Sequence, residues 1–149
     1  MTMISDHLTA VHGRCDELLA RGESAVSAGR WEDADGAFDA FRSVTEAHIE
    51  LEEQTLFPRI EPALGTTGPT QVMRGEHDRM RALMRAMGDA LGSRDEQRFL
   101  DAAETLLVLM RQHNAKEEAI LYPIMDDLVA EEEAAALLAG APSRRATGA

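Results

Sequence analysis

Two segments of the sequence share the pattern H-x-x-x-E-E-x-x-L-[FY]-P, in which x is any residue. One covers residues 48–58 and the other residues 113–123. On a helix, residues four positions apart lie on the same face, about one turn from each other. Imidazole nitrogens and carboxylate oxygens in such a pair can bind iron, manganese or zinc. Each segment therefore presents two candidate metal ligands to the same point: His48 with Glu52, and His113 with Glu117.

Two further histidines extend this candidate metal site. His77 lies in the middle of an apolar stripe, whereas His7 and His12 lie about equally far from the centre of theirs. Periodicity therefore leaves both N-terminal histidines open. With His77 and one of them, the set comprises four imidazoles and two carboxylates, which suits two metal ions that share the carboxylates. Solvated His–Glu pairs on exposed faces would explain one motif, but not two motifs in matched context.

Helices must position these residues, and glycines and prolines show where the helices end. We expect long helices over residues 3–27, 31–57, 70–91 and 95–128. Pro123 is expected to kink the last of them, and Ser93 is a possible cap at its start. A short helix over residues 131–138 and a disordered tail over residues 141–149 follow.

The apolar stripes of these helices include the candidate ligands. The stripe of the second helix contains Phe38, Phe41, Thr45, His48, Glu52, Thr55 and Leu56. That of the fourth contains Leu106, Met110, His113, Glu117, Ile120 and Ile124. A buried carboxylate must be paired, neutralised or bound to a metal, because an isolated buried charge is very costly. The pattern predicts an all-α protein, an up-down-up-down four-helix bundle over residues 1–140, with the two motifs facing each other.

Charge and composition exclude several classes of partner. The chain has 149 residues and a formal net charge of -12, which disfavours nucleic acid and anionic membrane surfaces. The sequence contains no run of about 20 apolar residues, so no membrane span is predicted, and no signal peptide is visible. The single cysteine, Cys15, cannot form an internal disulfide. We therefore expect a soluble, cytoplasmic protein.

The paired motifs, an early histidine and the Glu76-His77 dipeptide together resemble the hemerythrin-like HHE cation-binding domain family. The resemblance covers residues 3–128. It implies a four-helix bundle that holds two iron ions with an oxo or hydroxo bridge; manganese or zinc could occupy the same groups. It also favours His12 over His7, because His12 precedes Cys-Asp-Glu-Leu-Leu. By resemblance, the bridging carboxylates are Glu52 and Glu117, and the terminal imidazoles are His12, His48, His77 and His113.

One departure from the oxygen-carrying members affects the functional prediction. Those proteins have a second histidine four residues after the one in the third helix, where this chain has Arg81. The predicted function is a non-haem di-iron protein that binds O2, NO or a related small molecule in sensing, stress response or iron handling. The alternatives are a di-iron enzyme acting on peroxide or NO, and a metal-free helical interaction module.

Several residues near the candidate ligands have two possible roles. We expect Cys15 to be a buried apolar residue, with redox activity near the metal as the alternative. Tyr122 either donates a hydrogen bond to a metal-bound species or packs between helices. Glu53 and Glu118 are expected at the surface or behind the ligands.

Overall fold

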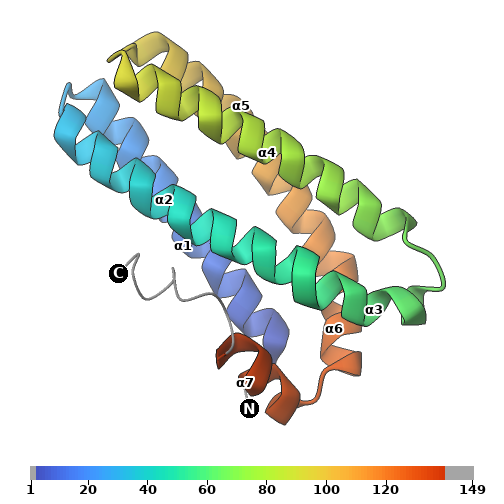
Figure 1. The fold of residues 1–149 in the computed structure, drawn as a ribbon. Coiled ribbons are helices and arrows are strands. Elements are labelled where there is room, and N and C mark those ends of the chain that lie inside the picture. Colours follow the sequence, from blue (N-terminus) through green and yellow to red (C-terminus); the bar gives the residue numbers. More distant parts are fainter. Residues whose placement is uncertain (1–2, 140–149) are drawn as a thin grey trace.

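The computed structural model describes residues 3–139, so the expected disordered tail over residues 141–149 lies outside it. Four long helices form the bundle, and each runs antiparallel to the next (Figure 1). α1 packs mainly along α2, and α4 along α5. No strand occurs among residues 3–139, which confirms the all-α bundle. The four helices are α1 (Ile4–Ser27), α2 (Trp31–Leu51), α4 (Gly68–Gly92) and α5 (Glu96–Lys116).

Two of these helices continue through a widened turn that was not predicted. α2 leads through the π-helical turn η1 (Glu52–Leu56) into α3 (Phe57–Leu64). α5 leads in the same way through η2 (Glu117–Leu121) into α6 (Tyr122–Leu128). The prediction that the second helix ends at Phe57 is therefore wrong. The interruption expected at Pro123 is a π turn that begins at Glu117.

The prolines after these turns explain why both helices widen there. The N–H of Phe57 donates to the carbonyl of Glu52, five residues back, and Tyr122 donates likewise to Glu117. The next residue in each case is a proline. A proline ring clashes with the carbonyl four residues before it in a regular α-helix. A wider turn displaces that carbonyl and lets the helix continue.

The extra residue in each π turn changes which side chains face the core beyond it. Ile120, which the stripe placed inside, is 57% exposed, and Ile124 is only half-buried. Thr55 is likewise only half-buried. A π turn holds one more residue than an α turn, so the buried stripe moves along the sequence. The buried residues at the end of the turns and in the helices that follow are Leu56, Phe57, Ile60, Leu121, Tyr122 and Met125.

The ends of the last helices differ slightly from the prediction. The Asp95 side chain accepts a hydrogen bond from the N–H of Arg98, so Asp95 caps α5. Ser93 instead lies at the end of α4, where its hydroxyl donates to the carbonyl of Asp89. The short helix α7 (Glu131–Ala139) forms where it was expected and contacts α1 (Figure 1). Within residues 3–139, no helix is both long and apolar enough to span a membrane.

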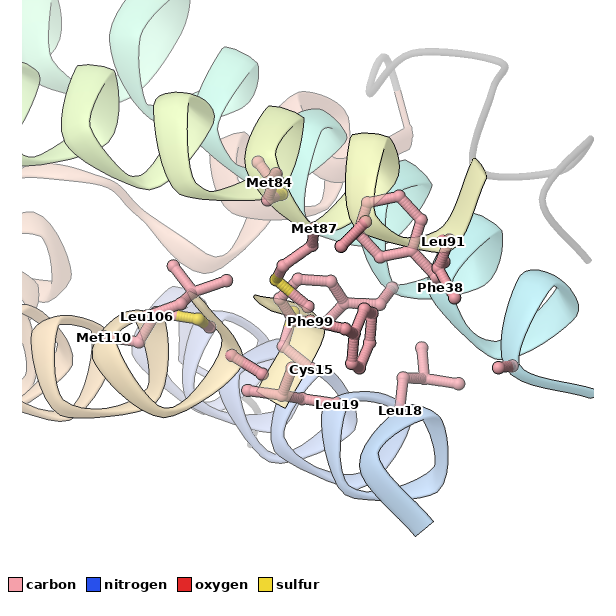
Figure 2. Packing of buried hydrophobic residues seen from close by; sticks show 14 of the residues in the cluster. Cys15, Leu18, Leu19, Phe38, Met84, Met87, Leu91, Phe99, Leu106 and Met110 are labelled. Atoms are coloured by element: carbon pink, nitrogen blue, oxygen red, sulfur yellow. The ribbon is translucent and has the colours of Figure 1, made fainter. Parts of the chain in front are cut away.

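Apolar side chains form two clusters with a polar layer between them. The Phe99 cluster fills the half of the bundle near the α1–α2 and α4–α5 connections; Figure 2 shows Phe38, Met84 and Phe99 among its side chains. The Phe57 cluster lies at the other end and includes Ile4, Leu8, Phe57 and Met125. In α1, Leu8 belongs to one cluster and Cys15 to the other, with His12 between them. The clusters close the polar layer at both ends along the bundle.

Candidate metal centre

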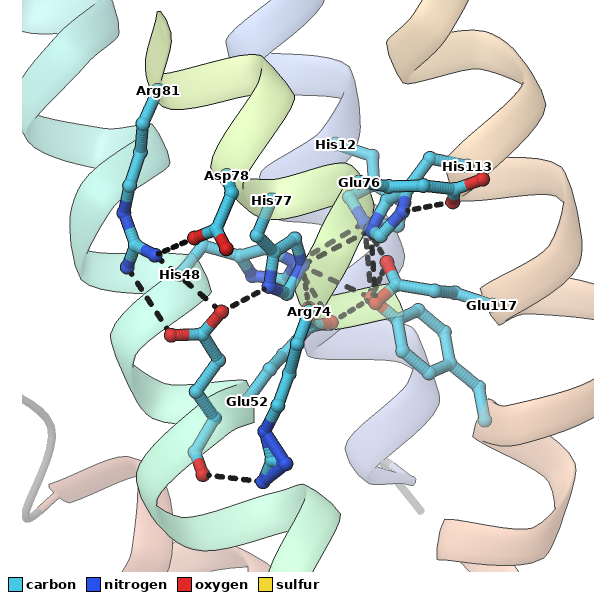
Figure 3. A network of polar contacts seen from close by, with 12 residues as sticks. His12, His48, Glu52, Arg74, Glu76, His77, Asp78, Arg81, His113 and Glu117 are labelled. Carbon is cyan, nitrogen blue, oxygen red and sulfur yellow. Dashed lines mark hydrogen bonds and ion pairs between the residues drawn. The ribbon is translucent and has the colours of Figure 1, made fainter. Parts of the chain in front are cut away.

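The polar layer contains all six predicted ligands. Their side chains come from α1, α2, α4 and α5 and from the first residue of each π turn (Figure 3). They form two groups that share both carboxylates, and within each group the candidate ligand atoms lie within 4.8 Å of one another. His7 is exposed and belongs to neither group, so the structure places His12 in the layer. The groups are His12, His48, Glu52 and Glu117, and Glu52, His77, His113 and Glu117.

Each shared carboxylate connects the two pairs of imidazoles. Glu52 Oε2 lies 3.1 Å from His48 Nε2, and its Oε1 lies 3.1 Å from His77 Nε2. Glu117 reaches the other imidazole of each pair, at 3.2 and 3.3 Å, again with a different oxygen for each. Two oxygens of one carboxylate that face two different imidazole pairs are suited to bridge two ions.

The imidazole nitrogens themselves indicate that a cation fits here. His77 Nε2 and His113 Nε2 lie 3.1 Å apart, while their Nδ1 atoms donate to carboxylates at 2.8 Å. A neutral imidazole that donates through Nδ1 has its lone pair on Nε2. Two lone pairs at this distance repel each other unless a proton or a metal ion lies between them.

The carboxylates also indicate that a cation fits in this layer. Glu52 Oε1 and Glu117 Oε2 are buried, and neither has a hydrogen-bond partner within the described part of the chain. Buried polar atoms are nearly always satisfied by hydrogen bonds or ions. Both oxygens lie against the Nε2 atoms of His77 and His113. A metal ion between these atoms would satisfy both carboxylates and both lone pairs, so the residues fit the metal that the sequence predicts.

A second set of carboxylates orients the imidazoles. Glu118 Oε2 lies 2.7 Å from His12 Nδ1, and Glu53 Oε2 lies 2.8 Å from His77 Nδ1. Both glutamates thus lie behind the candidate ligands, as expected. Glu76, which the sequence analysis gave no role, accepts from His113 Nδ1 and also pairs with Lys116. The position of Glu76 directly before His77 was the sequence feature that could have indicated this role.

Arg81 does not replace the missing histidine as a ligand. Its guanidinium contacts Glu46 at 3.1 Å, Glu53 at 3.3 Å and Asp78 at 3.4 Å. Figure 3 shows it directed toward Asp78 rather than toward the imidazoles. Burial lowers the pKa of Arg81, but the charges and hydrogen bonds of Glu46 and Glu53 raise it overall. Arg81 therefore holds Glu53, the carboxylate that orients His77.

The Tyr122 hydroxyl lies inside the candidate centre. It donates to Glu52 Oε2 at 2.7 Å, and it lies 2.9 Å from His12 Nε2 and 3.0 Å from Glu117 Oε1. Burial, together with the charges of Glu52 and Glu117, raises the pKa of Tyr122 well above its usual value. The phenol therefore stays neutral and acts as a donor. Of its two possible roles, hydrogen bonding at the site fits these contacts.

Cys15 lies in the Phe99 cluster, outside both ligand groups. Its Sγ accepts a hydrogen bond from the Thr45 hydroxyl at 3.3 Å. Burial raises the pKa of the Cys15 thiol to about 11. A neutral, buried thiol matches the expected apolar role and not the redox alternative.

In the metal-free protein, His113 links stability to pH. Burial lowers its pKa, but the neighbouring carboxylate of Glu117, together with Glu76, raises it from 6.5 to about 9. The stabilisation is complete below pH 6.5 and is lost as the pH rises through about 9. We expect the free energy of unfolding of chelator-treated protein to fall by about 1–3 kcal/mol over this range. Urea unfolding measures this change, and a His113→Gln variant that kept the full decrease would contradict it.

Comparisons with known proteins agree with the geometry. The model of the hemerythrin HHE cation-binding domain matches residues 3–125. Uncharacterized proteins of Mycobacterium tuberculosis and Mycobacterium bovis are 30% identical over 98 residues, which is 62% of this chain. The chain spans only 38% of the length of these relatives. No solved structure matches it significantly.

The family match includes every residue of the two groups, from His12 to Glu117. The resemblance inferred from the motifs is therefore confirmed at the level of the family. Cation binding, which the family name states, agrees with the buried histidines and glutamates of the polar layer. The chain belongs to the hemerythrin HHE cation-binding domain family.

Proposed function

We propose that this protein holds two iron ions and binds a small molecule such as O2, NO or peroxide, in sensing, stress response or iron handling. The observation that carries the proposal is the pair of shared carboxylates. Each of them directs one oxygen to each pair of imidazoles. Ligands for the two ions would be His12 and His48 at one position, His77 and His113 at the other, and Glu52 and Glu117 at both.

The number of protein donors supports a function that needs an open position. Each ion would have two imidazole nitrogens and two carboxylate oxygens. Mixed nitrogen and oxygen ligation with open positions suits iron, and manganese or zinc accept the same groups. When bound, iron supplies redox chemistry and a site for an external ligand. Arg81 lies behind Glu53 and leaves that site open, whereas a fifth histidine would fill a position.

The chain's own residues prepare the layer for a small ligand. Tyr122 holds a proton between Glu52 and His12 and can donate it to a polar ligand. The apolar clusters on both sides restrict entry of water, and they favour small neutral molecules over ions. Glu53, Glu76 and Glu118 fix the imidazole rings.

An enzyme acting on peroxide or NO is the alternative function, and the position of the Tyr122 hydroxyl, a donor among the candidate ligands, favours it because such reactions consume protons. Steady-state turnover separates the two. Iron-loaded protein that turns over peroxide or NO no faster than free iron would exclude the enzyme. Turnover that a Tyr122→Phe variant loses, while it keeps its iron, would support the enzyme.

Metal analysis of protein purified without chelator tests the main proposal. We expect about two iron ions per chain, with near-ultraviolet absorption that changes when O2 or NO is added to the reduced protein. Protein that stays empty in iron-supplemented solution would overturn the proposal and favour the metal-free interaction module. Protein that binds two ions but does not respond to O2, NO or peroxide would limit the function to metal handling.

A further inference from the structure

The two halves of the candidate centre correspond residue by residue, which makes their differences informative. His12 and His48 are 36 positions apart, and so are His77 and His113. The Nε2 atoms of each pair lie 3.1 Å apart. Phe57 stacks on His77 at 5.8 Å between ring centroids, and Tyr122 stacks on His12 at 5.5 Å. The centre thus has approximate twofold symmetry in its ligands.

The residues around the second imidazole of each pair break this symmetry. Glu76, which precedes His77, accepts from His113 Nδ1 at 2.8 Å and pairs with Lys116. In the other half, Val11 precedes His12, and Leu51 occupies the place that corresponds to Lys116. Two apolar residues therefore occupy, beside His48, the places that the Glu76–Lys116 ion pair occupies beside His113.

The consequence appears at His48. Val11 and Leu51 line a pocket of about 100 Å³ beside its ring, together with Leu8, Leu138 and His7. His48 Nδ1 is buried, and no described residue forms a hydrogen bond with it. The corresponding atom of His113 has a carboxylate partner. Among the described residues, His48 thus lacks the carboxylate partner at Nδ1 that would orient its ring and increase its basicity.

The carboxylate partners of His77 and His12 also differ, and again the His77–His113 half is the better supported one. Glu53, the partner of His77, is 20% exposed and is held by Arg81. Glu118, the partner of His12, is 40% exposed and has no cation beside it among the described residues. Arg81 and Lys116 each contact the carboxylate that lies between them and the centre. Their charges are thereby largely neutralised and repel a bound ion only weakly.

Tyr122 adds a further difference. Its hydroxyl contacts His12 Nε2 and Glu52 Oε2, two atoms that an ion at the His12–His48 position needs. Phe57, at the corresponding place in the other half, has no hydroxyl. An ion at the His12–His48 position must therefore displace hydrogen bonds that have no counterpart at the His77–His113 position.

We propose that the two metal positions are unequal, with the His77–His113 position binding its ion about 10–100-fold more tightly than the His12–His48 position. The factor is the usual loss when a histidine ligand lacks its carboxylate partner. This inference rests on the proposed two-metal function and assigns the weaker position to the half that contains Val11, Leu51 and Tyr122. The His12–His48 ion is the one that exchanges or is lost first.

Titration of the chelator-stripped full chain with Co²⁺ alone tests the proposal, with visible absorption and calorimetry as readouts. We expect two steps of one equivalent each, separated by about 10–100-fold in affinity. Glu76→Gln should weaken the tight step, because it removes the carboxylate charge beside His113. Glu118→Gln, a matched loss of one charge, should weaken only the second step. Far-ultraviolet circular dichroism confirms that both variants fold.

A gain of function provides the converse test. A Val11→Glu/Leu51→Lys double variant should place a carboxylate and its cation beside His48 and bring the second step closer to the first. Two equal steps in the original chain, or a Glu76→Gln variant that weakens only the second step, would overturn the inference and leave the proposed function intact. Absence of any binding would instead overturn the proposed function, and this inference with it.

Discussion

Replacing Glu52 or Glu117 by alanine is expected to abolish loading of both metal positions. Each carboxylate faces both imidazole pairs, so either variant removes one protein donor from each ion. Affinity should fall by more than about 100-fold at both positions, since loss of groups that merely orient the ligands already costs about 10–100-fold. Metal content after purification and Co²⁺ titration measure the effect.

The chain provides matched controls for these two variants. Glu104→Ala removes the same charge from an exposed position of α5 and should leave metal content unchanged. Glu53→Ala removes the partner of His77 and should weaken one position rather than both. Equal losses in Glu53→Ala and Glu52→Ala would contradict the assignment of Glu52 as a shared ligand and Glu53 as an orienting group.

Metal removal is expected to lower thermal stability strongly. An ion present at about 100 times its dissociation constant stabilises the folded state by about 2.7 kcal/mol, so two ions contribute at least about 5 kcal/mol when the weaker position is loaded to that extent. For a domain of this size, that corresponds to a decrease in Tm of about 10–20 °C. The decrease should be large because the metal-free layer packs imidazoles closely together and contains two buried carboxylate oxygens that have no hydrogen-bond partner among residues 3–139.

Differential scanning calorimetry of loaded and chelator-treated protein measures this change. The Glu52→Ala variant serves as the control, because its Tm should not respond to added metal. The same Tm for loaded and stripped original protein would show that the layer is stable without ions. That result would favour the metal-free interaction module over a metal centre.

The sequence alone determined the bundle and the candidate ligands. Glu52 and Glu117 follow their histidines by one helical turn, so local helical geometry is enough to bring each pair together. Glycines marked most helix ends, although the chain stays helical past Pro58, and the apolar stripes gave the all-α bundle. These features depend on neighbours within a few residues, which the sequence displays directly. The choice of His12 over His7 came from the family resemblance, and periodicity could not have made it.

Only the tertiary structure decided what happens beyond each motif. The π turns at Glu52 and Glu117 move Ile120 out of the core and bring Leu121 and Tyr122 into it. A pattern with a fixed period does not include one inserted residue, so the apolar stripe predicted the wrong buried residues beyond that point. The Tyr122 hydroxyl reaches the centre because of that shift.

The partners of the imidazoles were also beyond sequence reasoning. His113 is oriented by Glu76 of α4, and His48 faces a pocket lined by Val11 of α1 and Leu51. These contacts join residues of different helices, and they depend on how the helices are rotated and how far each is shifted along its axis. The sequence therefore determined which atoms could bind metal, because that choice is local. The packing of the helices decided which of those atoms have partners, because it sets distances between residues far apart in the chain.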